Sequence, residues 1–234
     1  MAKLYLIPNT ISEEGFSTIP SYIKAVVGSL RCFVVEEERE ARRFIKKICP
    51  ELPVAECTFF VMNEHSSPKE CKEIFEKAGD QDFGIIPEAG CPCIADPGAE
   101  LVLLAHQKNL EVIPLVGPSS ILLALMASGL NGQNFAFNGY LPKEREERIK
   151  KIKALERRSF TEDQTQIFME TPYRNQHVLE DILAHCDSQT FLCLAMGLTS
   201  PQQYIKTLSI AEWKKKGLSL PKQPALFLIY KFNK

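Results

Sequence analysis

Two acidic side chains, Glu88 and Asp96, lie in a stretch that is rich in turn-forming residues. An apolar run from Phe83 to Ile86 leads into it, and residues 87–98 then contain three prolines and two glycines. Prolines fix φ and glycines permit unusual φ values, so this composition predicts a loop held in one shape. Ligands of open α/β sheets bind just beyond the carboxyl ends of parallel strands. The stretch therefore predicts a ligand site with two carboxyl groups in it.

Three other residues of reactive type have two interpretations each. His65, in a predicted loop, is an acid/base candidate, although a structural histidine with satisfied hydrogen bonds is the default. Cys91 and Cys93 are candidate nucleophiles, but no helix start or fixed base lies near them in the sequence to lower their pKa, which favours a packing role. The eight cysteines are scattered and form no CxxC pair, so we expect no metal site.

Three arginines and one loop are also open to two interpretations. Arg39 and Arg42 either hold a substrate or form the solvated face of a helix. Arg174 starts a helix, where it is either solvated or a ligand contact. The Gly117–Ser120 segment (GPSS) reads as a linker and helix N-cap, or as a pocket wall lined by backbone.

Several common enzyme classes are excluded by what the sequence lacks. No segment matches GxGxxG or GxxxxGK[ST], which makes a standard dinucleotide fold or a P-loop improbable. A Rossmann-type methyltransferase, which needs a glycine-rich turn after its first strand, fits poorly. No GxSxG elbow supports a hydrolase.

The pattern of apolar residues predicts two α/β domains. Up to residue 115, strands alternate with helices, which predicts a largely parallel sheet covered by helices. One of these helices is expected from Ser17 to Leu30, with Ser17 as its N-cap. Residues 116–118 form the predicted hinge, and the second half has more strands than helices, which favours a mixed sheet. We expect domains at about 1–115 and 118–234, with a ligand cleft between them.

Composition places the chain among globular proteins that remain in the cytosol. Its 234 residues are 45% hydrophobic and 24% charged, with a net charge of −1, so nucleic-acid binding would need a local basic patch. The first ten residues contain no basic segment followed by an apolar stretch, and no apolar run is long enough to span a bilayer. We expect a cytoplasmic protein with reduced thiols and no membrane contact.

Seven motifs, in the order that the family has them, resemble the tetrapyrrole methylase superfamily, the two-domain S-adenosylmethionine-dependent methyltransferases. Within it, the sequence is most similar to the 16S ribosomal RNA (cytidine-2'-O)-methyltransferase family. The family's DAGTPLISDPG corresponds to EAGCPCIADPG here, its PGPSAxxxALxxSGL to VGPSSILLALMASGL, and its YExPHR to METPYR. The opening LYLIPNT, the EEEREAR helix start, the Glu64-His65-Ser66 turn and FNGYLPK also have counterparts.

This resemblance implies a methyltransferase that folds S-adenosylmethionine into the interdomain cleft. The implied cofactor contacts are Asp96, Ala99, Ser120, Ile121, Met169, Ala195 and Ala225. For the attacking hydroxyl, Glu88 is the first candidate base and His65 the second. Arg39, Arg42 and Arg174 are the candidates for holding RNA phosphates.

The expected substrate is ribosomal RNA or the small ribosomal subunit, at a ribose 2'-hydroxyl, and the expected assembly is a homodimer. Two alternatives stay open: methylation of a tetrapyrrole or another small molecule, and a non-catalytic module that binds the cofactor. The second arises because the family's Ala-Arg-Glu-Leu-Thr is Ala-Met-Gly-Leu-Thr here, so Met196 and Gly197 replace two charged residues.

Overall fold

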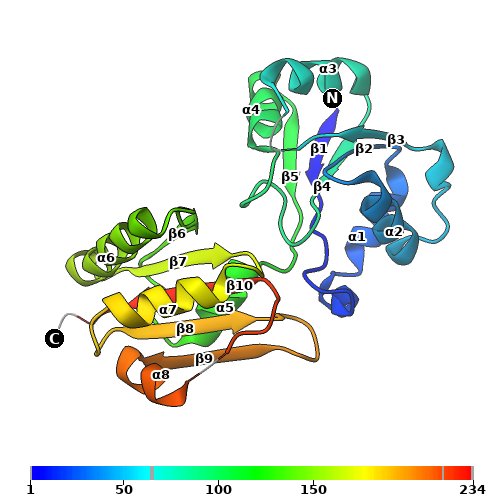
Figure 1. The fold of residues 1–234 in the computed structure, drawn as a ribbon. Coiled ribbons are helices and arrows are strands. Elements are labelled where there is room, and N and C mark those ends of the chain that lie inside the picture. The colour runs from blue at the N-terminus through cyan, green and yellow to red at the C-terminus, as the bar shows by residue number, and fades with distance from the viewer. Residues whose placement is uncertain (1, 64–65, 218, 233–234) are drawn as a thin grey trace. The chain divides into compact units, whose positions relative to one another are not determined.

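The chain forms two compact units, Met1–Ser119 (unit 1) and Ser120–Lys234 (unit 2) (Figure 1). The structure is a computed structural model that describes residues 2–63, 66–217 and 219–232. None of the helices in these ranges combines the length and the apolar character needed to cross a bilayer.

Unit 1 is an α/β domain in which strands and helices alternate, as the sequence predicts. Its elements are β1 (Lys3–Leu6), η1 (Gly15–Thr18), α1 (Tyr22–Ser29), β2 (Cys32–Val35), α2 (Glu38–Ile48), η2 (Val54–Glu56), β3 (Thr58–Val61), α3 (Pro68–Ala78), β4 (Phe83–Ile86), α4 (Ala99–Gln107) and β5 (Glu111–Pro114). The strands pair in the order β3-β2-β4-β1-β5, and every pair is parallel. The prediction of a parallel sheet is confirmed.

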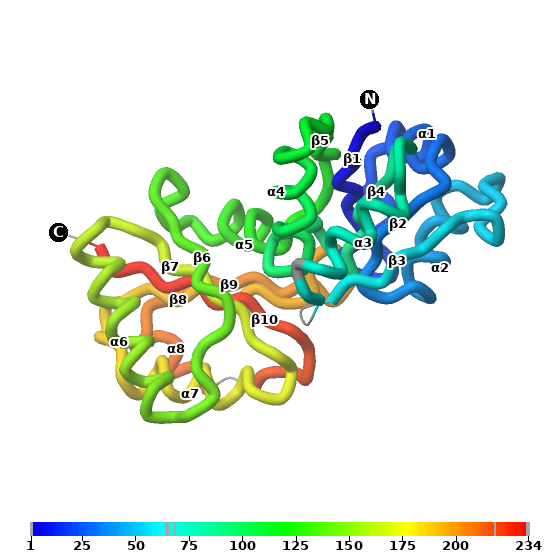
Figure 2. The backbone as a smooth tube through the Cα atoms, turned by 90° about the horizontal axis from the view of Figure 1, so that it is seen from above, coloured from blue at the N-terminus to red at the C-terminus, as the bar shows by residue number. Residues whose placement is uncertain are grey.

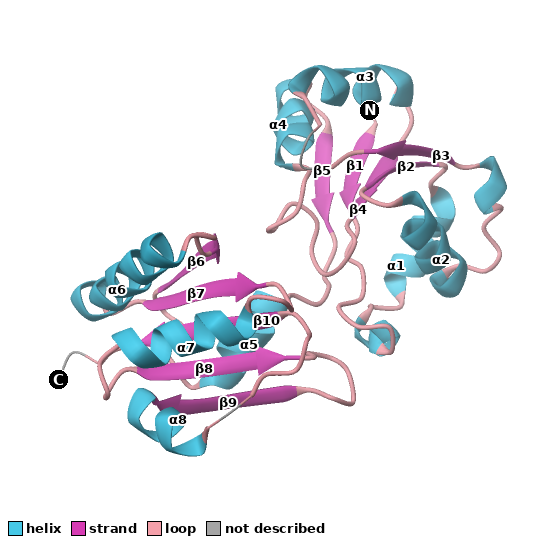
Figure 3. Ribbon diagram, in the orientation of Figure 1, coloured by secondary structure: helices cyan, strands magenta, loops and turns pink. Residues whose placement is uncertain are grey.

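Both faces of this sheet are buried under helices, which explains why its strands are apolar at successive positions. On β2, Phe33 and Val35 pack with residues of α1 and α2, whereas Cys32 and Val34 pack with residues of α3 and α4. Figure 3 shows the helices around the strands of unit 1. All carboxyl ends of the strands point to one edge, where the loops after β1 and β4 lie next to each other because β1 pairs with β4.

Unit 2 has the mixed sheet that the sequence predicts. Its elements are α5 (Ser120–Ser128), β6 (Phe135–Tyr140), α6 (Arg145–Glu162), β7 (Thr165–Glu170), α7 (Asn175–His185), β8 (Phe191–Met196), β9 (Tyr204–Ser209), α8 (Ile210–Lys216) and β10 (Ala225–Tyr230). The strand order is β6-β7-β10-β8-β9; β6 is parallel to β7, and the other neighbours are antiparallel.

The main core of unit 2 lies on one face of this sheet. Figure 2 shows α5 on one side of the strands and α6, α7 and α8 on the other. Phe168 and Phe227 stack in that core with ring centroids 5.6 Å apart. The buried Trp213 of α8 donates its indole N–H to the carbonyl of Leu192 at 2.8 Å, which fastens the helix to the sheet.

The helix predicted from Ser17 to Leu30 is wrong in its first half. Residues Gly15–Thr18 form a 3-10 turn, Ile19 is extended with φ −87° and ψ 117°, and α1 begins only at Tyr22. The cause is Pro20, whose ring disfavours helical backbone at the residue before it. Ser17 is therefore not an N-cap.

Gly84, in β4, is needed because the side chain of Ile7, directly after β1, approaches its backbone. A Cβ atom there would lie 2.5 Å from Cδ1 of Ile7 and 3.2 Å from Cδ1 of Leu30. We predict that Gly84→Ala lowers the free energy of unfolding by about 1–3 kcal/mol, because Ile7 must move within a packed core. Chemical denaturation measures this, with Gly132→Ala as the control, since a Cβ at Gly132 meets nothing within 4 Å. Equal midpoints for the two variants would contradict the prediction.

Candidate functional site

Asn9 ties the loop after β1 to the loop after β4. Its side-chain amide donates to the carbonyls of Pro87 and Glu88, both at 3.0 Å, and its carbonyl oxygen accepts from the amide of Thr10 at 2.8 Å. Two backbone bonds join Asn9 and Gly90, at 2.8 and 3.2 Å. Asn9 is buried, so these bonds are shielded from water. The sheet edge is therefore one connected surface.

The loop at residues 87–98 has the fixed shape that its composition predicts. Cys93 and Ala95 have φ values of 66° and 62°, and Gly90 and Gly98 have 72° and 128°. A Cβ at Gly98 would lie 2.7 Å from Sγ of Cys93, so only glycine fits there. α4 begins directly afterwards at Ala99, which is exposed.

Asp96 is a half-buried carboxyl group in an acidic surrounding. Burial, followed by the nearby carboxylates of Glu36 and Glu88, raises the pKa of Asp96 from 3.8 to about 6. All three residues follow the carboxyl ends of β2 and β4, so the topology concentrates negative charge at one place. A positively charged ligand at this place would be stabilised, and it would in turn favour the ionised form of Asp96.

Asp96 lines two sizeable cavities of unit 1 and a third of only about 10 Å³. The larger, of about 660 Å³, is bounded by the loop after β1, by α2 and by the loop after β4, and Glu88 also lines it. The smaller, of about 210 Å³, lies along the residues that lead into α4, including Ala99.

The larger cavity, referred to below as the α2 cavity, also has cationic and aromatic walls. Arg43 and Lys47, four residues apart on α2, line it together with Phe16 and Phe44. Nζ of Lys47 lies 3.7 Å from the centroid of the Phe16 ring, and the Phe16 and Phe44 rings stack at 6.2 Å. Arg43 forms an ion pair with Glu40 at 2.6 Å. The cavity thus offers carboxylates on one side and cations beside an aromatic ring on the other.

The two loop cysteines have the packing role that the sequence favours. Burial and the carboxylate of Asp96 raise the pKa of both thiols, that of Cys93 to about 11. The thiol of Cys91 donates to the carbonyl of Pro118 at 3.4 Å. Neither thiol is poised to ionise as a nucleophile. Among the described residues, no three His, Cys, Asp or Glu side chains form a group that could hold a metal ion.

Two of the three predicted phosphate contacts already have partners within the protein. Arg42 donates to Glu38 at 2.8 Å and to the carbonyl of Val54 at 2.9 Å, with its guanidinium 4.2 Å from the Phe59 ring centroid. Arg42 therefore connects α2 to η2 and β3. Arg39 is exposed on α2, outside the lining of the α2 cavity.

Arg174 is likewise engaged in holding a loop. It donates to the carbonyls of Leu141 and Pro142 at 2.9 and 2.8 Å and forms an ion pair with the buried Glu170 at 3.1 Å. These contacts fix the segment between β6 and α6 against the end of β7. A phosphate would have to compete with all three partners.

Unit 2 brings some of its expected cofactor contacts together. Met169 and Ala195 lie on either side of Leu226, across β7, β10 and β8. They share the face covered by α5, because Thr207, opposite Cys193, donates to the carbonyl of Ser128 at the end of α5 at 2.7 Å.

The other expected contacts of unit 2 lie outside this row. Ala225 precedes Leu226 on β10 and pairs with Glu170 and Met196. Its side chain therefore points to the opposite face of the sheet, where it lies in the core. Ser120 and Ile121 begin α5. His65 lies outside the described residues.

Sequence reasoning missed three residues of this site: Asn9, Arg43 and Lys47. For the two cations a signal existed, since positions 39, 43 and 47 follow at intervals of four residues and therefore lie along one side of a helix. For Asn9 the only signal was its position directly after a predicted strand.

The fold is shared with solved methyltransferase structures. Diphthine synthase matches with a TM-score of 0.66 and 14% identity, over 99% of this chain and 90% of that one. The methyltransferase CobJ matches with a TM-score of 0.63 and 16% identity, over 99% and 100%. Uroporphyrin-III C-methyltransferase from Thermus thermophilus, complexed with S-adenosyl homocysteine, matches with a TM-score of 0.58 and 13% identity, over 98% of both chains. At these identities the likeness concerns the fold.

Sequence comparison narrows the relationship. No protein-family model matches the chain. Ribosomal RNA small subunit methyltransferase I of Vibrio cholerae is 29% identical over 210 residues, which are 89% of this chain and 69% of that protein. The protein of that name from Escherichia coli O157:H7 is 27% identical over 92% of this chain and 72% of its own length. The one from Bacillus subtilis is 32% identical over 76% and 58%.

The parallel sheet of unit 1 and the mixed sheet of unit 2 are thus the fold of these solved methyltransferase structures. In sequence, the chain is similar to ribosomal RNA small subunit methyltransferases I over most of its length.

We predict that Asn9→Ala lowers the free energy of unfolding by about 2–3 kcal/mol, because it removes three side-chain hydrogen bonds and leaves two carbonyls without donors. Loosening of the 87–98 loop should also weaken binding of S-adenosylmethionine in calorimetry. Thr10→Ala is the control, since Thr10 contacts Asn9 through its backbone amide. If Asn9→Ala and Thr10→Ala were equally stable, the Asn9 side chain would not hold the 87–98 loop in place.

Asp96→Asn should stabilise the protein at neutral pH. The folded state raises the pKa of Asp96 from 3.8 to about 6, so the stability that its protonated form provides is complete below pH 3.8 and lost as the pH rises through about 6. Wild type and variant should therefore have similar free energies of unfolding below pH 3.8, and the advantage of the variant should grow between pH 3.8 and about 6 and stay constant above that. Urea denaturation across this range measures the difference, with the exposed Asp80→Asn as control. A difference that does not vary with pH would refute the account.

Proposed function

We propose that this protein transfers a methyl group from S-adenosylmethionine to RNA of the small ribosomal subunit, at a ribose 2'-hydroxyl. The observation that carries the proposal is the similarity, over 89% and 92% of the chain, to two proteins named for methylating that RNA. The α2 cavity supports it, because carboxyl groups and cations line one space beside the 87–98 loop that Asn9 holds.

The residues of the sheet edge fit a cationic methyl donor. S-adenosylmethionine, when bound, supplies a methyl group on a sulfonium, already activated for displacement. Asp96, held half-buried near two other carboxylates, would accept hydrogen bonds from a cationic or hydroxyl group and gain from the added positive charge. In unit 2, Met169 and Ala195 offer an apolar surface. Ala99, Ser120, Ile121 and Ala225 stay predicted contacts.

Glu88 is the residue that we propose as general base. It is exposed, it lines the α2 cavity, and its backbone is fixed by Asn9. A ribose hydroxyl is a poor nucleophile, so transfer of its proton to a nearby carboxylate assists its attack. The carboxylate of Glu88 would take that proton as the oxygen–methyl bond forms. His65 stays the second candidate.

The α2 cavity is the proposed site of the acceptor nucleotide. Arg43 and Lys47 are better placed than Arg42 or Arg174 to hold its phosphate, because they line the cavity that contains Glu88. The ring of Phe16 offers a surface on which a base stacks. Arg39 stays a predicted contact at the end of the same helix face.

A homodimer and a cytoplasmic location are further proposals. Sedimentation at several protein concentrations tests the first, and fractionation of the native cells tests the second.

The function is tested on small ribosomal subunits from a strain that lacks this protein. Wild-type enzyme with labelled S-adenosylmethionine should label their RNA, and mass spectrometry of the nucleosides should find one additional 2'-O-methyl group. We expect Glu88→Gln to lower kcat by about 10²–10⁴-fold with unchanged cofactor affinity, because only the proton acceptor is lost. Lys47→Glu should mainly raise KM for the subunit. Unlabelled subunits together with methylation of a tetrapyrrole precursor would overturn the proposal.

A further inference from the structure

The near-neutral net charge conceals an opposite charge on the two units. Unit 1 has 12 Lys and Arg against 18 Asp and Glu, whereas unit 2 has 16 against 11. The units thus carry net charges of −6 and +5. A polyanion is repelled by the first and attracted by the second, so a nucleic-acid surface outside the α2 cavity is expected in unit 2.

The basic residues of unit 2 form a stripe on α6. The helix packs Arg148, Ile152, Leu155 and Ser159 inward. On its outward side, Lys150, Lys153, Arg157 and Phe160 follow at intervals of three or four residues, which places them in one row. All four are exposed. We call this row the α6 stripe.

The cations of the α6 stripe are largely available to a ligand. Lys150 forms a short-range ion pair with Glu147 at 2.7 Å, with both side chains more than half exposed. Lys153 and Arg157 have no ion-pair partner among the described residues. In contrast, Lys151 and Arg158 lie on another side of the helix, and Arg158 pairs with Glu162 at 2.9 Å. Surface pairs of this kind contribute little stability, so a phosphate readily displaces them.

The aromatic end of the stripe suits a nucleic-acid base. The side chain of Phe160 is 38% exposed, a large apolar area at the end of a charged row. Nζ of Lys231 lies 5.9 Å from its ring centroid. Cations beside an exposed aromatic ring are the arrangement by which proteins bind single-stranded nucleic acids, with phosphates on the cations and a base stacked on the ring.

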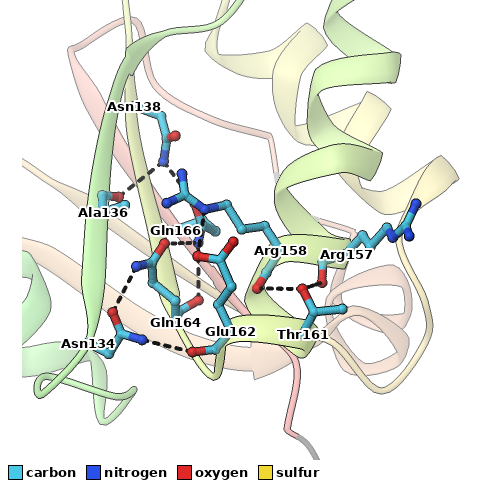
Figure 4. Close-up of polar contacts among 9 residues, drawn as sticks. All are labelled: Asn134, Ala136, Asn138, Arg157, Arg158, Thr161, Glu162, Gln164 and Gln166. Carbon is cyan, nitrogen blue, oxygen red and sulfur yellow. Dashed lines mark hydrogen bonds and ion pairs between the residues drawn. The ribbon is translucent and has the colours of Figure 1, made fainter.

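The carboxyl end of α6 is held rigidly on the sheet. Asn134 donates to the carbonyl of Glu162 at 2.8 Å, and Gln164 donates to Asn134 at 2.8 Å. Gln166 and Asn138 continue this chain of amides between β6 and β7, and Figure 4 shows Arg157 directed away from it. From Lys150 to Arg157 the helix advances about 10 Å. Over that distance a single strand of nucleic acid presents two or more phosphates.

We propose that the α6 stripe is a docking surface for single-stranded RNA of the substrate, with phosphates on Lys150, Lys153 and Arg157 and an unstacked base on Phe160. This inference rests on the proposed function. It names a second RNA contact, separate from the α2 cavity, that raises affinity without taking part in the chemistry.

The test compares Lys153→Glu/Arg157→Glu with Lys214→Glu/Lys215→Glu, which changes the net charge equally on the exposed face of α8. Fluorescence anisotropy with a labelled single-stranded RNA, at several salt concentrations, measures affinity. The α6 variant should bind the RNA at least tenfold more weakly. The slope of log K against the logarithm of the salt concentration should become smaller in magnitude by about 1.4, because two phosphate contacts are lost. The α8 variant should bind like wild type. Phe160→Ala should weaken binding without changing the salt dependence.

Cofactor affinity, measured by calorimetry, should be unchanged in every variant, which shows that each is folded. Equal binding of RNA by wild type and the α6 variant, or equal loss in both charge variants, overturns the inference. If wild type itself neither binds RNA nor methylates small subunits, the proposed function fails instead. Methylation that persists at wild-type KM in the α6 variant rejects the α6 stripe alone.

Discussion

The side-chain amide of Asn9 is the interaction on which the site depends. In a parallel sheet, neighbouring strands bring their following loops to one edge, but pairing of strands does not fix the shape of those loops. Here one buried side chain satisfies the carbonyls of Pro87 and Glu88, and a pair of backbone bonds joins Asn9 to Gly90. The position of Glu88, and through the loop that of Asp96, therefore follows from a residue nearly eighty positions earlier.

The carboxylates at this edge of the sheet destabilise the ligand-free protein, and binding of a cationic ligand explains why they are there. Burial of the Asp96 carboxyl group is costly, and repulsion from the nearby carboxylates of Glu36 and Glu88 adds to that cost, which is why its pKa is raised to about 6. Sequences optimised for stability alone would place an amide there. A cationic ligand reverses the balance, because it converts an unfavourable charge into a favourable interaction. Strain of this kind is characteristic of binding sites.

Fold class was readable from the sequence, whereas the detail of the site was not. Alternating strands and helices up to residue 115 and the excess of strands after it predicted the two sheets. The loop at 87–98 was found from its prolines and glycines. The error at Ser17 came from giving periodicity more weight than Pro20. Arg42 and Arg43 are adjacent in sequence, and only the packing of α2 against η2 shows that the first is structural and the second faces the α2 cavity.

Met196 and Gly197, the two replacements that suggested a non-catalytic module, are explained by their local structure. Met196 is buried in the core beneath α6, α7 and α8, where an arginine would place a charge in an apolar surrounding. Gly197 has a φ of 57°, and a Cβ there would lie 3.0 Å from the carbonyl oxygen of Gln202, so a glutamate would be strained. Methionine and glycine thus suit the tight turn after β8. Because Glu88 and Asp96 lie in unit 1, on a loop with its own supports, this change leaves their arrangement intact.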